Sequence, residues 1–160
     1  MPEGSPEWVA RRRDAAAFRH VLVPLSGDPD DELLMRTACR IAQMFRARLS
    51  LVYVIEVPMA LPVDAPELSE APKAEEALAR AKQIASGTDV DVACLQARDA
   101  GHAIVEQAVD TAVDLIFMGV HVRERMGVLS LGRTATYVLR HAPCAVWVSR
   151  WTVPETASPE

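Results

Sequence analysis

The stretch that decides the fold runs over Asp114–Arg150 and reads DLIFMGVHVRERMGVLSLGRTATYVLRHAPCAVWVSR. It begins with a short apolar run at 115–118, which predicts a buried strand that stops at Gly119. After a loop, a helix is predicted over 132–141, and a second apolar strand follows at 145–148. A strand, a helix and a further strand in this order are typical of parallel sheets with right-handed crossovers.

The chain before this stretch repeats the same alternation of strands and helices. Short runs rich in Val, Leu and Ile predict strands at 20–25, 49–55 and 90–97. Apolar residues at helical spacing predict helices over 30–47, 73–86 and 101–112. The order of elements therefore predicts an α/β fold with an open, doubly wound, five-stranded parallel sheet and helices on both faces, a Rossmann-like arrangement. The alternating pattern at 90–97 favours an edge position in this sheet.

Length and composition indicate one domain with two loose ends. The chain has 160 residues, half of them hydrophobic, which is enough for one core without disulfide or metal support. We expect a flexible N-terminal arm over 1–17, the domain over 18–150 and a C-terminal tail over 151–160. A stretch rich in proline, 57–72, is predicted to be irregular.

Charge and cysteine content narrow the classes of function. The formal net charge of −5 argues against a general nucleic-acid binder, and the basic run Arg11–Arg13 is most simply a solvated tail. Cys39, Cys94 and Cys144 lie far apart in apolar stretches. We therefore expect the three cysteines to act as small hydrophobic residues in a reducing cytosol, and we expect neither a disulfide framework nor a zinc site. No apolar run reaches the roughly 18–20 residues that span a bilayer, so a cytoplasmic protein is expected.

The expected topology also predicts where a ligand would bind. In doubly wound sheets, ligands lie at the carboxyl ends of the strands, where the strand order reverses. The segments that this rule selects are 24–27, 53–56 and 119–134. Ser26 and His121 fall in these segments, but no G-x-S-x-G elbow is present to expose the serine. The acidic run after the first strand fits a solvated helix start better than a metal site.

The C-terminal stretch resembles the C-terminal half of universal stress protein domains. The shared pattern is a strand ending in Met-Gly, a loop, a helix that starts at glycine and the block Tyr137–Cys144, YVLRHAPC. The resemblance covers about 19–150. It implies the adenine nucleotide alpha hydrolase-like form of the fold, and a homodimer formed through the last strand, Ala145–Val148.

Nucleotide-binding members of this family carry Gly, two residues, Gly, nine residues and then Gly followed by Ser or Thr. Glycines let backbone N–H groups approach phosphate, and the helix start adds its dipole. Gly119 matches the first glycine and Gly132 the third, and His121 keeps a histidine often found between the first two. The resemblance therefore implies a phosphate loop between 119 and 134.

Three positions depart from the family pattern. Val122 replaces the second glycine, and Ser26 stands where the family has an acidic residue near the nucleoside. Arg133 replaces the Ser or Thr, with Thr134 one place later. A β-branched Val122 is expected to resist a positive φ and to crowd a phosphate, whereas Arg133 brings a cation to the helix start. The segment Arg123–Arg125 is an anion clamp or, slightly favoured, a solvated loop.

The expected ligand-binding residues combine this loop with the ends of the first two strands. They are Pro24, Leu25, Ser26, Val54, Met118, Gly119, His121, Val122, Gly132, Arg133 and Thr134. No catalytic residue and no metal ligand is predicted. ATP and AMP are the cofactors that the resemblance suggests, and the altered loop predicts millimolar or no affinity for ATP with magnesium.

Three functions are consistent with these residues. The first is a regulatory domain of the stress response, not an enzyme, that binds an adenine nucleotide weakly or another small anionic ligand. The second is a dimerising interaction module with a vestigial pocket, and the third is a slow nucleotide hydrolase. The segments 61–67, 98–108 and 132–134 also resemble universal-stress-type domains on the cytosolic side of amino-acid permeases and cation transporters. Trp8 and Arg11–Arg13 would suit a juxtamembrane arm in such a transporter partner.

Overall fold

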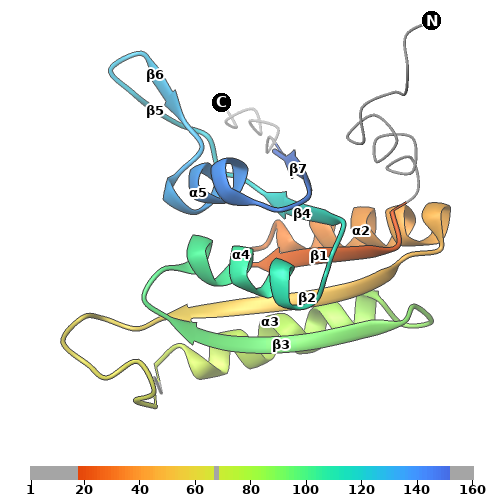
Figure 1. The fold of residues 1–160 in the computed structure, drawn as a ribbon, viewed down its shortest axis with the longest axis horizontal. Helices are drawn as coiled ribbons and strands as arrows, with labels where there is room; N and C mark the ends of the chain where they lie inside the picture. Colours follow the sequence, from red (N-terminus) through yellow and green to blue (C-terminus); the bar gives the residue numbers. More distant parts are fainter. Residues whose placement is uncertain (1–17, 67–68, 152–160) are drawn as a thin grey trace, which may run out of the picture.

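The computed structural model describes residues 18–66 and 69–151 (Figure 1). Strands and helices alternate along the chain, with a short hairpin inserted before the last helix. The elements are β1 (His20–Leu25), α2 (Asp31–Phe45), β2 (Arg48–Glu56), α3 (Ala71–Ile84), β3 (Val90–Ala97), α4 (Ala100–Asp110), β4 (Leu115–Gly119), β5 (Arg123–Arg125), β6 (Val128–Ser130), α5 (Arg133–His141) and β7 (Ala145–Ser149).

The main sheet has five parallel strands in the order β3-β2-β1-β4-β7, which confirms the predicted fold class. β1 lies at the centre, between β2 and β4. β3 lies at one edge, as the alternating pattern of its residues predicted, and β7 lies at the other. The chain therefore adds β2 and β3 on one side of β1, and then β4 and β7 on its other side.

Two apolar layers cover the faces of this sheet. Along β1, Val21 and Val23 point to the layer that includes Met35 of α2, whereas Leu22 points to the layer that includes Val138 of α5. This alternation follows from the period of two along a strand. Figure 1 shows the pair α2 and α3 on one face and the pair α4 and α5 on the other. β1 is therefore apolar at almost every position because both of its faces are covered.

Element boundaries differ from the predicted ones by one or two residues. The largest shifts are of two residues, at the ends of α2 and α4 and at both ends of α3, which begins at Ala71 where a start at Lys73 was predicted. Pro72 lies in the first turn of this helix. A first-turn proline costs no hydrogen bond, because the N–H that it lacks would have no partner within the helix.

The predicted loop over 120–131 contains a small antiparallel hairpin, so the loop prediction was incomplete. β5 and β6 pair through Arg125 and Val128, and the turn between them has only two residues. Met126 and Gly127 both have positive φ, at 52° and 75°. Positive φ at both turn residues is the backbone conformation of tight two-residue hairpin turns, whose twist matches that of the flanking strands. The sequence signal is weak because Asn or Asp is the usual residue at the first of these positions.

The three cysteines do not share one environment. Cys39 is buried and Cys144 is partly buried. Burial and the Asp114 carboxylate raise the pKa of the Cys144 thiol to about 11. Cys94 is exposed, although it was expected to behave as a small hydrophobic residue in an apolar stretch. Its place on the edge strand β3 explains the difference, because no residue along that strand is fully buried.

Two predictions from the sequence concern residues outside the described ranges. The arm over 1–17, with Arg11–Arg13, and the tail from 152 to 160 both lie there. Trp151 is described, and it packs against the apolar layer that α2 and α3 cover. None of the helices in the described ranges is long and apolar enough to cross a membrane.

The central position of β1 predicts a steep cost for shortening its side chains. Leu22 is fully buried, so Leu22→Ala should lower the free energy of unfolding by roughly 2–5 kcal/mol. Leu33→Ala on α2 is the matched control, because Leu33 is 46% exposed and its loss should change stability by about 0.5 kcal/mol or less. Urea denaturation measures both, and equal costs for the two variants would contradict this account of the core.

Candidate functional site

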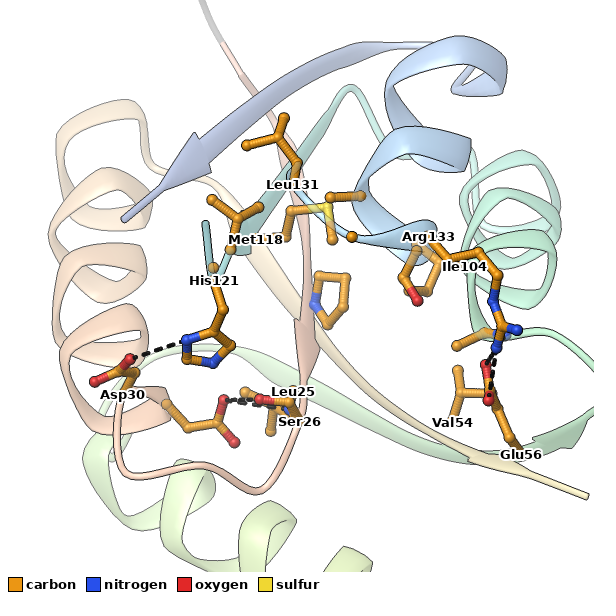
Figure 2. A pocket seen from close by; sticks show the side chains of 18 of the residues that line it. Leu25, Ser26, Asp30, Val54, Glu56, Ile104, Met118, His121, Leu131 and Arg133 are labelled. Carbon is orange, nitrogen blue, oxygen red and sulfur yellow. Dashed lines mark hydrogen bonds and ion pairs between the residues drawn. The ribbon is translucent and has the colours of Figure 1, made fainter. Parts of the chain in front are cut away.

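A cavity of ≈ 1010 Å³ opens at the carboxyl ends of β1, β2 and β4, beside the start of α5 (Figure 2). Small-molecule sites typically have about 300–1,000 Å³. The structure brings ten of the eleven predicted site residues to its wall: Pro24, Leu25, Ser26, Val54, Met118, Gly119, His121, Gly132, Arg133 and Thr134. The cavity lies at the point where the strand order reverses, which is where the topology predicts a ligand.

Val122 is the predicted site residue that does not line this cavity. His121 and Arg123 on either side of it do, which fits the alternation of side chains along an extended segment. Val122 is partly buried and is not among the described non-glycine residues with positive φ. Val122 therefore does not line the cavity in this structure, and the expectation that it crowds a bound phosphate stays a prediction.

An acidic residue that sequence analysis assigned to a solvated helix start lines the cavity. Asp31, in the first turn of α2, accepts hydrogen bonds from the Ser26 N–H at 3.2 Å, the Ser26 hydroxyl at 3.3 Å and the Gly27 N–H at 2.7 Å. Burial raises the pKa of this carboxyl, the hydrogen bonds from Ser26 and Gly27 oppose that shift, and the Asp28 charge adds to it. Asp31 therefore places a carboxylate beside Ser26, where the family's acidic residue is missing.

His121 joins two loops at the same side of the cavity. Its Nε2 lies 3.2 Å from Asp28 Oδ2, and its Nδ1 lies 3.8 Å from Asp30 Oδ2. Figure 2 shows the ring between the end of β4 and the loop that precedes α2. Both nitrogens thus contact carboxylates of this chain, so His121 forms part of the wall and orders the acidic loop.

Arg133, like His121, was predicted to contact the ligand, and it too forms ion pairs with carboxylates of this chain. Its Nη2 donates to both Glu56 carboxylate oxygens, at 3.1 and 3.2 Å, and its Nε lies 3.6 Å from Asp99 Oδ2. The two carboxylates are themselves fixed, because Glu56 accepts from the Ala100 N–H and Asp99 from the His102 N–H. Arg133 therefore ties the start of α5 to β2 through Glu56, as Figure 2 shows, and to α4 through Asp99.

The β5–β6 hairpin brings two further cations to the cavity. Arg123, Arg125 and Ser130 all line it, although sequence analysis slightly favoured a solvated loop for this segment. Neither arginine makes an ion pair with another described residue. Asp30, Asp31, Glu56 and Glu70 also line the cavity, so its wall carries both acidic and cationic groups.

Trp151 also lines the cavity, next to Gly119. A Cβ atom added at Gly119 would lie 3.7 Å from the Trp151 ring, which is an ordinary van der Waals contact, so neither the ring nor a positive φ requires glycine here. Sequence analysis placed this residue in the tail and gave it no role in the site. Among the described residues, no group of three or more His, Cys, Asp or Glu side chains is placed to hold a metal ion.

The strand order and the cavity at its reversal define a doubly wound α/β ligand-binding domain. A model of the Universal stress protein family matches residues 17–150. The chain therefore belongs to the universal stress protein family, as its C-terminal stretch indicated. A comparison with curated proteins gave no match.

Solved universal stress proteins share this fold. One from Archaeoglobus fulgidus is 20% identical with a TM-score of 0.70, covering 82% of this chain and 98% of that one. A universal stress protein in complex with cAMP is 22% identical with a TM-score of 0.61, covering 84% and 98%. The Archaeoglobus fulgidus protein in complex with dAMP is 18% identical with a TM-score of 0.66, covering 82% and 97%.

The raised pKa of Asp31 predicts a pH dependence of stability. A carboxyl whose pKa is higher in the folded than in the unfolded state stabilises the fold while it is protonated. That contribution is complete below the unfolded value of 3.8 and is lost as pH rises through the folded value. Between about pH 4 and pH 7, wild type should therefore lose stability relative to Asp31→Asn, which does not titrate.

Urea denaturation across this pH range measures the difference in free energy of unfolding between the two proteins. Asp110→Asn, at an exposed position at the end of α4, is the control for the replacement of an aspartate outside the cavity. A difference for Asp31→Asn that does not change with pH would mean that burial of this carboxyl has no energetic consequence.

Proposed function

We propose that this chain is a regulatory domain of the universal stress type that binds a small anionic ligand without catalytic turnover. An adenine nucleotide is the first candidate for that ligand. The observation that carries the proposal is the open cavity at the strand-order reversal, which is lined by carboxylates and by Arg123 and Arg125, neither of which forms an ion pair with another described residue. The regulated process is the stress response or the activity of a partner such as a transporter.

The polarity of the cavity fits a nucleotide lying across it. Carboxylates such as Asp31 accept hydrogen bonds from sugar hydroxyls or base amino groups, whereas guanidinium groups bind phosphate oxygens. Two of the solved relatives are complexes with cAMP and dAMP, each of which carries one phosphate group. An adenosine monophosphate therefore suits this cavity better than ATP with magnesium, for which the altered loop lacks the second glycine.

The contacts of Ser26 and His121 support a function without catalysis. The Ser26 hydroxyl donates to Asp28 Oδ2 at 2.9 Å, and His121 Nε2 lies 3.2 Å from the same oxygen. A nucleophilic serine needs the histidine between itself and the carboxylate, so that the ring can take the hydroxyl proton. Here the carboxylate lies between the two, which leaves the serine without a base.

An open cavity also favours ligand binding over a vestigial pocket. A thermal-shift series with AMP, cAMP, ATP with magnesium and adenosine tests this, because a ligand that binds the native state raises its melting temperature. AMP and cAMP should raise it, adenosine much less, and ATP with magnesium should bind at roughly millimolar concentration or above. If none of the four changes the melting temperature, the chain is better explained as an interaction module.

We further propose that the chain forms a homodimer through the free edge of β7. β4 pairs with one side of this strand, and no described strand pairs with the other. Trp147 and Val148 on it are each 40% exposed, so an apolar strip accompanies the open backbone. An edge of this kind is a template for pairing with a second chain.

A charge on this strip should raise the monomer fraction. Val148→Lys is the appropriate change, because Val146 packs against the core and its replacement would also weaken the fold. Val92→Lys, on the opposite edge strand β3, is the control at 38% exposure and should leave the dimer intact. Analytical ultracentrifugation reports the oligomeric state, and dissociation by Val92→Lys alone would place the interface on β3.

A further inference from the structure

The β5–β6 hairpin presents two different faces. In its antiparallel register Arg123 pairs with Ser130 and Arg125 with Val128, so these four residues share one face. Glu124 and its partner Leu129 lie on the other face. Arg123, Arg125 and Ser130 line the cavity, whereas Glu124 and Leu129 do not. The pairing of the strands thus directs both guanidinium groups toward the cavity and the carboxylate away from it.

The hairpin also fixes the spacing of the two arginines. Residues two apart on one strand lie roughly 7 Å apart, which lets two long side chains converge on one phosphate group. The turn at Met126 and Gly127 keeps the register, because two residues with positive φ close the hairpin in one way. Figure 1 shows the hairpin projecting from the body of the domain beside the start of α5.

The charges around the cavity distinguish these arginines from its other cationic residues. Arg133 is paired with Glu56 and Asp99, and His121 contacts Asp28 and Asp30. Within the described ranges, the hairpin arginines have no such partner. The remaining carboxylates at the cavity, Asp31 and Glu70, come from α2 and the segment before α3.

We infer that this hairpin is the phosphate-holding element of the site. Arg123 and Arg125 form a guanidinium clamp for a dianionic phosphate monoester, and they replace both the glycine cradle and a bridging metal ion. The inference rests on the proposed ligand binding and names the group that is bound. Guanidinium forks donate two parallel hydrogen bonds to phosphate and cannot lose their charge at neutral pH.

The clamp predicts which ligands are preferred. A phosphate monoester such as AMP carries nearly two negative charges at neutral pH, because its second pKa is about 6. A cyclic phosphodiester such as cAMP carries one. Two unpaired guanidinium groups therefore favour AMP over cAMP, and magnesium should weaken AMP binding because it neutralises the charge that the arginines need.

Titration calorimetry of the full chain with AMP and with cAMP, in magnesium-free buffer, tests the clamp. Wild type should bind AMP more tightly than cAMP. The double variant Arg123→Gln and Arg125→Gln should bind AMP at least roughly tenfold more weakly, since each charge-assisted hydrogen bond contributes about that factor. The preference for AMP should disappear in that variant. Glu124→Gln, on the opposite face of the same strand, is the matched control and should change AMP affinity by no more than about twofold.

The double variant Arg123→Lys and Arg125→Lys keeps both charges, so it should bind AMP more tightly than the double glutamine variant. This comparison separates loss of charge from damage to the hairpin. If wild type binds neither nucleotide, the proposed function and the clamp both fail. If wild type binds AMP and the double glutamine variant binds it equally well, the clamp is wrong while the proposed function stands. Tighter AMP binding in added magnesium would overturn the proposal that the arginines hold the phosphate without a metal ion.

Discussion

The pairing of β1 between β2 and β4 is the constraint on which the rest of this structure depends. Its two faces are covered by different helix pairs, so the connections that leave β1 and β4 diverge to opposite sides of the sheet. The space between them at the carboxyl end becomes the cavity. The site therefore exists because of strand order, and the residues that surround it decide only what it can hold.

Ion pairs across the rim of this cavity connect elements that the sheet alone does not hold. His121 links β4 to the loop before α2, and Arg133 links α5 to β2 and α4. These pairs are largely exposed, with 72% of the Arg133 side chain accessible, so each contributes little to stability. Their main effect is on geometry: they occupy His121 and Arg133, which stand at two positions of the family motif, and within the described ranges they leave the hairpin arginines without an ion-pair partner.

The sheet and its edges could be predicted from the sequence because their signals are local. The apolar run at 20–25 and the alternation at 90–97 each report the environment of one strand. The site was less predictable because its contacts are distant in sequence: Arg133 and Glu56 are separated by 77 positions. The family motif identified Val122 as a loop position, but the direction of its side chain depends on the hairpin, whose turn lacks the usual Asn or Asp. Asp31 was overlooked because an acidic helix start explains the same residues without a cavity.

Replacing a backbone cradle by two side chains changes the energetics of holding phosphate. Backbone N–H groups in a glycine loop are already ordered, whereas an exposed arginine gives up as much as about 2 kcal/mol of side-chain entropy when it is fixed. Each charge-assisted hydrogen bond returns about 1.5–3 kcal/mol, so an arginine that makes only one such bond has a net gain of about 1 kcal/mol or less. A clamp of this kind releases its ligand readily. A regulatory domain, as proposed for this chain, requires reversible occupancy that follows the ligand concentration. A carrier of tightly held nucleotide would need an ordered glycine cradle, whose second glycine is Val122 here.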